Sequence, residues 1–324
     1  MVGNRYLLYS VFLITAGLFV GCATTEFGVD QGEVDEWDPA SENVTSIQSI
    51  TSADEADYQP KSTTDNKILF SSDRDGDLDV WMTSLDGGGG MDQLTTSSGN
   101  DIRPSPHPDN EQFVFISQRR EEPEMFMSHV DRPTATALAT ISEPEFAGFS
   151  SPEFSPDGSK IVYASGRHIW VYELETGTRT QMVTGHQPSW HPNGEKIVFV
   201  RKAGEVGDGI TTSIWMMDSD GTNLTQLISS GEEAAYQYPN ISPDSQRIVY
   251  TRASVQNDRT GELDEEDIWV ADIDGTGATQ LTTNPFPDTH PDWLSETRIV
   301  FSSARPDTDD IEDAAWNIWS LSFK

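Results

Sequence analysis

The chain has 324 residues, with 20 Lys and Arg against 54 Asp and Glu, one Cys, and 35% apolar residues. A net charge of −34 repels phosphate backbones and anionic headgroups, which argues against nucleic-acid binding and against membrane binding through basic residues. One Cys excludes an internal disulfide and any zinc or iron–sulfur site built on several cysteines.

The amino terminus is typical of a secreted protein. Residues 1–21 carry one charge, Arg5, followed by the apolar run LLYSVFLITAGLFV. This run is shorter than the roughly 20 residues of a membrane-spanning helix, so it predicts a signal peptide. The stretch from Leu18 to Cys22 resembles a bacterial lipoprotein box, which implies cleavage before Cys22 and lipidation of Cys22. Ala23 follows in place of Asp, which favours the outer membrane. An uncleaved anchor helix is the alternative.

Residues 22–44 are expected to form an acidic, disordered tether. The segment contains seven Asp and Glu residues, no Lys or Arg, and few apolar residues. Such a composition cannot bury enough apolar surface to offset the entropy lost on ordering.

Six copies of one unit follow the tether. Each copy opens with a Pro, then a short strand, a turn and a β-branched apolar run, as in PEFSPDGSKIVYAS from Pro152. The copies start at Pro60, Pro104, Pro152, Pro188, Pro239 and Pro291, with spacings of 44, 48, 36, 51 and 52 residues. This period is typical of propeller blades with variable loops.

Each copy continues with a second apolar run that carries one aromatic residue: Trp81, Phe126, Trp170, Trp215, Trp269 or Trp319. These runs alternate with period two between turn residues, so they predict strands. We interpret the repeated aromatic residues as core residues, because each ring can bury roughly 150 to 250 Å² between neighbouring blades. A third run follows in five copies, and the unit is therefore a four-stranded antiparallel meander.

The sixth copy ends at Lys324 after only three strands. The segment ITSADEADYQP before the first copy is similar to ISSGEEAAYQYP before the fifth, where a fourth strand leads into the next blade. We therefore expect residues 45–52 to complete the last blade and remove its exposed edge. The predicted fold class is all-β: a six-bladed β-propeller of four-stranded antiparallel blades over residues 45–324, closed by an N-terminal strand.

The repeated patterns resemble those of TolB-type propellers. The resemblance rests on P-x-W/F-S-P-D-G-x-x-I-V-Y/F, on SDRDG at Ser72 to Gly76, and on D-x-D-G-T-x-x-x-Q-L-T at Asp272 to Thr282. It covers residues 46–324 and implies the propeller fold.

One face of the propeller is the predicted binding site. The loops that join one blade to the next place mixed aromatic, amide and charged groups around the mouth of the central channel, beside acidic insertions at residues 258–267 and 307–313. Such a face suits capture of a peptide or a protein surface. The predicted partner-binding residues are Tyr58, Gln59, Arg103, His186, Gln187, Tyr236, Gln237, Tyr238 and His290. The alternative is that these loops are only solvated.

Two groups of residues have side chains that are typical of metal sites. Asp73, Asp75, Asp77 and Asp79 alternate in one predicted hairpin and could bind calcium, although the closing bidentate Glu of a calcium loop is absent and a plain turn is the alternative. His186 and His290 with Gln237 resemble the metal ligands of propeller lyases that act on oligogalacturonides. A catalytic site normally needs three protein ligands and a general base.

The sequence thus predicts a lipid-anchored bacterial protein at the cell envelope, facing the periplasm from the outer membrane. Its expected role is non-catalytic: a monomeric scaffold that binds a protein or peptide, without nucleic acid and without a required cofactor. A metal-dependent polysaccharide lyase or hydrolase is the alternative. The acidity suits either a saline habitat or attraction of a cationic partner.

Overall fold

The computed structural model describes residues 41–52, 55–86, 90–120, 122–132, 134–140, 151–206, 209–229, 234–255, 263–305 and 315–324. The predicted signal peptide, Cys22, most of the tether, the 307–313 insertion and part of the 258–267 insertion lie outside these residues. Within the described part of the chain, no helix is long and apolar enough to cross a membrane.

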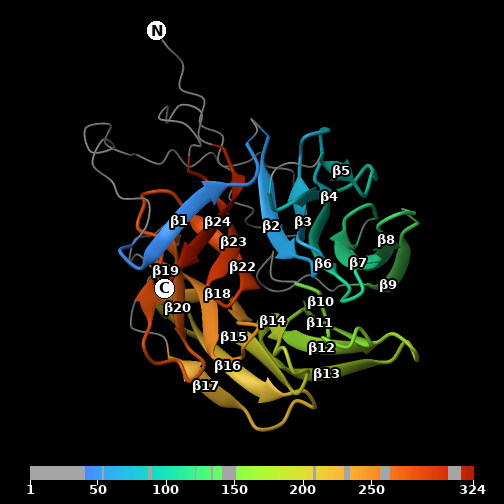
Figure 1. Cartoon of the computed structure of the whole chain (residues 1–324). Helices are drawn as coiled ribbons and strands as arrows, with labels where there is room; N and C mark the ends of the chain where they lie inside the picture. Colours follow the sequence, from blue (N-terminus) through green and yellow to red (C-terminus); the bar gives the residue numbers. More distant parts are fainter. Residues whose placement is uncertain are drawn as a thin grey trace.

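The strands form six sheets of four antiparallel strands, arranged as blades around a centre (Figure 1). Blade 1 consists of β2 (Asp57–Ser62), β3 (Lys67–Ser72), β4 (Asp79–Ser84) and β5 (Asp92–Gln93). Blade 2 consists of β6 (Asp101–Pro106), β7 (Gln112–Ser117), β8 (Glu124–His129) and β9 (Thr136–Thr140). Blade 3 consists of β10 (Glu153–Phe154), β11 (Lys160–Ser165), β12 (His168–Glu173) and β13 (Arg179–Thr184).

The remaining blades follow the same order. Blade 4 consists of β14 (His186–Trp190), β15 (Lys196–Val206), β16 (Gly209–Asp218) and β17 (Thr225–Ile228). Blade 5 consists of β18 (Ala234–Ile241), β19 (Arg247–Val255), β20 (Leu263–Asp272) and β21 (Thr279–Gln280). Blade 6 consists of β22 (Asp288–Ser295), β23 (Arg298–Ser303), β24 (Asn317–Phe323) and the N-terminal strand β1 (Val44–Ser49). The predicted all-β, six-bladed fold is confirmed.

The N-terminal strand closes the ring, as predicted. β1 pairs with β24 from Val44 opposite Phe323 to Ser49 opposite Trp319, and the two strands lie side by side in Figure 1. Val44 and Ile47 also pack against the apolar cluster between blades 5 and 6. Residues 41–43, expected in the tether, are held in place by hydrogen bonds such as Ser41 N to Leu281 O at 3.0 Å. The Ser41 backbone therefore contacts blade 5, directly after β21.

The core lies between blades. Each of six apolar clusters joins two neighbouring blades, for example Leu69 with Phe113 between blades 1 and 2, and Phe70 with Val300 between blades 1 and 6. One sheet cannot bury both of its faces alone, whereas blades packed around an axis can. Every blade depends on both neighbours, so the closing strand stabilises the whole ring.

The repeated aromatic residue of the third strand has a fixed partner. It lies opposite an aromatic residue of the second strand in each blade, as in Phe70 opposite Trp81 and Tyr250 opposite Trp269. Only Phe126 and Trp319 are fully buried, and the other four are half-buried. In five blades an arginine covers the ring, with distances of 4.4 to 5.2 Å from the guanidinium carbon to the ring centroid. Phe126 and Trp319 thus belong to the core clusters, as expected, and the other four rings pack against those clusters at their edge, with an arginine over five of the six rings.

Candidate functional site

The innermost strand of each blade faces the central channel and is marked by a proline. β2, β6, β14, β18 and β22 each contain one of the repeated prolines, and Pro152 directly precedes β10. A proline has no N–H to donate, so it suits these edge strands, which have no neighbouring strand on the side that faces the channel. The repeat thus sets a proline at the same depth in every blade.

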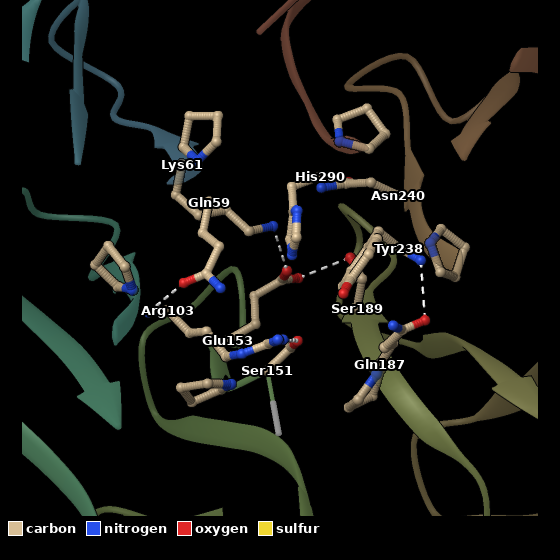
Figure 2. Close-up of a pocket in the computed structure, with 16 residues that line it drawn as sticks. Gln59, Lys61, Arg103, Ser151, Glu153, Gln187, Ser189, Tyr238, Asn240 and His290 are labelled. Atoms are coloured by element: carbon tan, nitrogen blue, oxygen red, sulfur yellow. Dashed lines mark hydrogen bonds and ion pairs between the residues drawn. The ribbon is translucent and has the colours of Figure 1, made fainter. Parts of the chain in front are cut away.

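The residues on either side of these prolines form two rings. The pre-proline ring consists of Gln59, Arg103, Ser151, Gln187, Tyr238 and His290. The post-proline ring consists of Lys61, Ser105, Glu153, Ser189, Asn240 and Asp292. With the exception of Ser105 and Asp292, these residues and the six prolines line one pocket (Figure 2). The sequence therefore builds a channel wall from one repeated tripeptide.

Five members of the pre-proline ring have a left-handed backbone. The φ angles are 58° for Gln59, 57° for Arg103, 49° for Gln187, 50° for Tyr238 and 54° for His290. Pairing with the second strand shifts its register at each of these positions, which is the mark of a β-bulge. Residues other than glycine rarely adopt this conformation, and bulges frequently re-aim a side chain near a functional site.

Two glutamines compensate the bulges across neighbouring blades. The Gln59 Oε1 atom accepts a hydrogen bond from Arg103 N at 3.0 Å, and Gln187 Oε1 accepts one from Tyr238 N at 3.0 Å. A bulge leaves backbone groups without a ladder partner, and a buried N–H must be satisfied elsewhere. These side chains therefore fix the backbone of the next blade.

The post-proline ring is internally compensated. Lys61 Nζ lies 3.0 Å from a Glu153 oxygen and 3.0 Å from an Asp292 oxygen, which joins blades 1, 3 and 6. Burial lowers the pKa of Lys61, but Asp292 and Glu153 outweigh it and hold that pKa above its usual value. Asn240 donates to Asp292 at 2.6 Å, and Trp190 N donates to Glu153 at 2.7 Å. These contacts join blades 1, 3, 4, 5 and 6 through the post-proline ring.

The pre-proline ring lacks such compensation. Arg103 is 8% exposed, and its guanidinium donates to Ser151 Oγ at 3.0 Å and lies 5.9 Å from the Tyr238 ring centroid. Among the described residues, no carboxylate is within ion-pair distance of it. The Gln187 amide nitrogen and both ring nitrogens of His290 are buried without a hydrogen-bond partner among these same residues. Around one pocket, the Arg103 charge thus has no counterion, and the amide nitrogen of Gln187 and the ring nitrogens of His290 have no hydrogen-bond partner among the described residues.

His290 and Tyr238 stack on each other. Their ring centroids are 3.8 Å apart, with 30° between the ring planes. Burial lowers the pKa of His290 well below its usual value, and the positive charges of Arg103 and Lys61 lower it further. Burial also raises the pKa of the Tyr238 hydroxyl, although Arg103 opposes this shift. Both rings are therefore neutral near pH 7.

Four predicted face residues lie outside this ring. Tyr58 packs against Trp316 at 5.4 Å between centroids, and Tyr236, 8% exposed, packs in the cluster between blades 4 and 5. Gln237 donates to Glu266 at 3.3 Å, where burial first and Asp288 second raise the pKa of Glu266 to about 7. Burial lowers the pKa of His186 to about 4. Strand alternation turns Tyr58, His186 and Gln237 away from the pocket, whereas the β-bulge at Tyr238 separates that residue from Tyr236.

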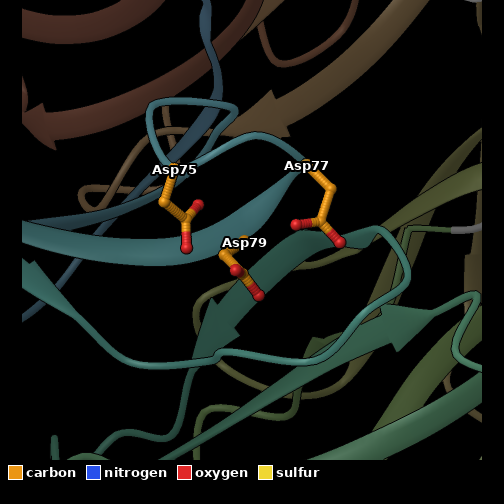
Figure 3. Close-up of side chains that lie close together, drawn as sticks. All are labelled: Asp75, Asp77 and Asp79. Atoms are coloured by element: carbon orange, nitrogen blue, oxygen red, sulfur yellow. The ribbon is translucent and has the colours of Figure 1, made fainter.

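The predicted calcium residues separate into two groups. Donor atoms of Asp75, Asp77 and Asp79 lie within 4.8 Å of one another (Figure 3). Asp73 is turned elsewhere and accepts from Ala56 N at 2.8 Å. Burial and the nearby Asp75 and Asp101 carboxylates raise the pKa of Asp79 to about 6, although Thr95 opposes this by donating at 2.7 Å. Carboxylate oxygens suit calcium, and calcium binding by these residues stays a prediction.

The two channel histidines form no obvious metal cluster. Within the described ranges, the only group of three His, Cys, Asp or Glu side chains with converging donor atoms is the aspartate group above. His290 lines the pocket, whereas His186 does not. A site on His186, His290 and Gln237 would need the last two ligands to come from different strand faces.

Sequence reasoning missed the charged members of the post-proline ring. Lys61, Glu153 and Asp292 follow the repeated proline, where the other blades carry Ser or Asn. Charged residues on a channel-facing strand were the available signal. Their pairing joins positions 92 and 231 residues apart, which only the closed ring brings together.

The fold and the channel define the class: a closed β-propeller with a polar, proline-marked central channel. The family model described as the TolB beta propeller domain matches residues 39–213, and the chain belongs to that family. No curated protein matches the chain significantly.

Solved structures show the same fold. TolB from Acinetobacter baumannii has a TM-score of 0.63 at 18% identity, and the match covers 76% of this chain and 59% of that one. The chain thus spans less than two thirds of that TolB. A putative TolB from Agrobacterium tumefaciens gives 0.61 at 16% identity, covering 86% and 97%. An oligogalacturonate lyase from Vibrio parahaemolyticus gives 0.55 at 16% identity, covering 85% and 93%.

Proposed function

We propose that this protein is a non-catalytic scaffold of the bacterial cell envelope that binds a protein or peptide at the channel mouth. The observation that carries the proposal is the pre-proline ring beside the stacked Tyr238: Arg103 there has no counterion, and Gln187 and His290 have side-chain nitrogens without a hydrogen-bond partner among the described residues. Buried polar groups without partners are costly, so a site that retains them is suited to a ligand that supplies the partners. TolB-type membership supports this role.

Affinity capture tests the scaffold. The tagged full chain is expressed in its own organism, cross-linked, purified from detergent-solubilised envelopes, and its partner is identified by mass spectrometry. We expect a stoichiometric partner that is lost with Arg103→Met and with His290→Asn. Arg132→Met, which removes an exposed arginine on blade 2, is the matched control and retains the partner. Capture of the same proteins by all variants would refute the proposed face.

We further propose a monomer tethered by lipid at Cys22, on the periplasmic side of the outer membrane. The lipoprotein-like stretch before Cys22 supports the anchor. Metabolic labelling with a fatty-acid analogue tests it: the native chain is expected to incorporate the label and Cys22→Ser is not. Label on both chains would contradict the anchor.

A metal-dependent lyase or hydrolase of acidic polysaccharide is the second candidate. It is favoured by the fold shared with oligogalacturonate lyase and by the cationic Arg103 in the pocket. Metal analysis of the purified chain discriminates the two. A stoichiometric transition metal that is lost with His186→Ala and His290→Ala, together with cleavage of oligogalacturonate, would favour the enzyme over the scaffold.

A further inference from the structure

The pre-proline ring contains polar side chains whose hydrogen bonds are incomplete. The Arg103 guanidinium carries five N–H groups, and its side-chain partners are both uncharged: Ser151 Oγ and the Tyr238 hydroxyl. The Gln187 side chain is 2% exposed, and its oxygen accepts from Tyr238 N. Its amide nitrogen lies near the Tyr238 hydroxyl but makes no hydrogen bond of good geometry among the described residues. His290 adds two ring nitrogens without partners among the described residues. A single hydrogen-bond acceptor that enters the pocket could pair with all three side chains.

The sign of the missing group follows from the charges. Lys61 is shared by Glu153 and Asp292 at 3.0 Å each, so those carboxylates are already engaged. Arg103 is the remaining cation among the residues that line the pocket, and it has no carboxylate within ion-pair distance in the described chain. A buried charge is normally paired. A ligand with one negative charge would complete the site.

The size and shape of the pocket select among anions. Its cavity volume is about 60 Å³, several times the about 10 to 15 Å³ that one water molecule needs. One permanent cation with a neutral amide and a neutral imidazole balances a monoanion, whereas a phosphate dianion needs more positive charge. A planar carboxylate also matches the fork of a guanidinium.

We propose that the pre-proline ring is a carboxylate-binding site in which Arg103 and Gln187 donate to the two carboxylate oxygens and His290 donates from its ring. This inference rests on the proposed binding role of the channel mouth and names the chemical group that the channel receives. The carboxylate belongs either to a small organic acid or to the C-terminus of a peptide.

Calorimetric titration of the full chain in detergent micelles tests the site. The probes are sodium acetate, N-acetyl-diglycine and N-acetyl-diglycinamide at constant ionic strength and pH 7. We expect the two acids to bind and the amide not to bind. Arg103→Met weakens the affinity about 10- to 100-fold, because it removes a charged hydrogen-bond donor. Arg132→Met leaves the affinity unchanged.

A second variant keeps the test decisive if Arg103→Met does not fold. Gln187→Glu keeps the oxygen that accepts from Tyr238 N but replaces the amide donor by a second oxygen, so it abolishes acid binding. Binding of both acids indicates a general carboxylate site, and binding of N-acetyl-diglycine alone indicates a C-terminus.

Two results would overturn the carboxylate site. They are no heat from either acid at 100-fold the protein concentration and with millimolar acid, or equal binding of acid and amide. Failure of the scaffold is a different result, because the titration needs no protein partner. A captured partner with blank titrations rejects the carboxylate site alone, and acid binding without any captured partner rejects the scaffold alone.

Discussion

The two rings of the channel differ in how they treat a buried cation. Lys61 in the post-proline ring has two carboxylates at 3.0 Å, whereas Arg103 in the pre-proline ring contacts a hydroxyl and an aromatic ring. The two residues are contributed by neighbouring blades at almost equivalent repeat positions. The post-proline ring therefore joins the blades together, whereas the pre-proline ring has polar groups that can still pair with a ligand.

This difference separates stability from binding. A buried ion pair whose partners are all present can be neutral for stability, but loss of one partner leaves an uncompensated charge. A buried cation without a counterion lowers stability in the free protein and is compensated when an anion binds. The rings should thus respond oppositely to removal of their cations.

The largest expected effect is that of Lys61→Met. The change leaves Glu153 and Asp292 without a counterion in the channel, and we expect unfolding free energy to fall by about 3 kcal/mol. Urea denaturation at pH 7 measures the loss. Lys67→Met is the matched control, because Lys67 pairs with Asp65 at the surface, and such pairs contribute about 1 kcal/mol or less.

A double variant sharpens the assignment. Glu153→Gln removes one of the two charges that Lys61 compensates and leaves the oxygen that accepts from Ser189 and Trp190 N. Added to Lys61→Met, it should recover part of the lost stability. If Lys61→Met lowers the unfolding free energy no more than Lys67→Met does, the post-proline ring has no structural role.

The next effect concerns the pH dependence of stability that arises from His290 in the pre-proline ring. Because the pKa of folded His290 lies well below 6.5, the unfolded chain takes up a proton below pH 6.5 that the folded protein does not. The unfolding free energy therefore decreases as the pH is lowered through this range, by about 1.5 kcal/mol from pH 6.5 to pH 5 for this residue. His290→Asn should remove that contribution, and Asn tolerates the positive φ.

Urea denaturation at several pH values measures this slope. His186 has a pKa lowered to about 4 and contributes in the same direction, so part of the acid sensitivity remains in the variant. An unchanged slope in His290→Asn would mean that the ring is protonated, and hence already supplied with an acceptor.

A smaller pH dependence of stability, of opposite sign, is expected from Glu266, which accepts a hydrogen bond from Gln237 next to the pre-proline ring. The pKa of folded Glu266 is raised to about 7 from 4.5. The folded protein therefore holds the proton more tightly, and stability falls as the pH rises from 4.5 through 7. Glu266→Gln should raise stability at pH 8 by about 1 kcal/mol, since the part-exposed side chain is screened by water.

The gain should become small near pH 4.5, where folded Glu266 is protonated and the unfolded group is already half protonated. Melting temperatures of Glu266→Gln and the native chain at pH 4.5, 6 and 8 measure it, with the exposed Glu175→Gln as control. A gain that is equal at all three pH values would show that packing, not ionisation, is responsible.

Much of the fold could be predicted from the sequence, because local repeats encode it. The proline before each inner strand and the aromatic residue of each third strand recur at one position per blade, so blade number, strand order and the closing strand followed from them. The repeated aromatic residues do lie in or against the core clusters, but the sequence did not predict the arginines, such as Arg252, that lie over them. That contact needs a cation from the adjacent strand, and single-strand periodicity does not reveal it.

The candidate site was predicted as a face, not as a set of contacts. Gln59, Arg103, Gln187, Tyr238 and His290 were placed on that face and line one pocket. Neighbouring residues such as Gln237 and Tyr238 point to opposite faces of the strand, and the β-bulge at Tyr238 separates it from Tyr236, which regular alternation would place on the same face. Whether a polar group has a partner depends on distances across the ring, which no linear pattern contains.

The smallest predicted effect is the most informative about the two rings. Arg103→Met in the ligand-free protein should leave stability within about 1 kcal/mol of the native value or increase it, because Arg103 has no counterion that its loss would expose. The methionine retains much of the apolar contact with the Tyr238 ring. Urea denaturation beside Lys61→Met gives the comparison directly. A loss as large as that of Lys61→Met would mean that Arg103 is structural, and both rings would then serve to hold the blades together.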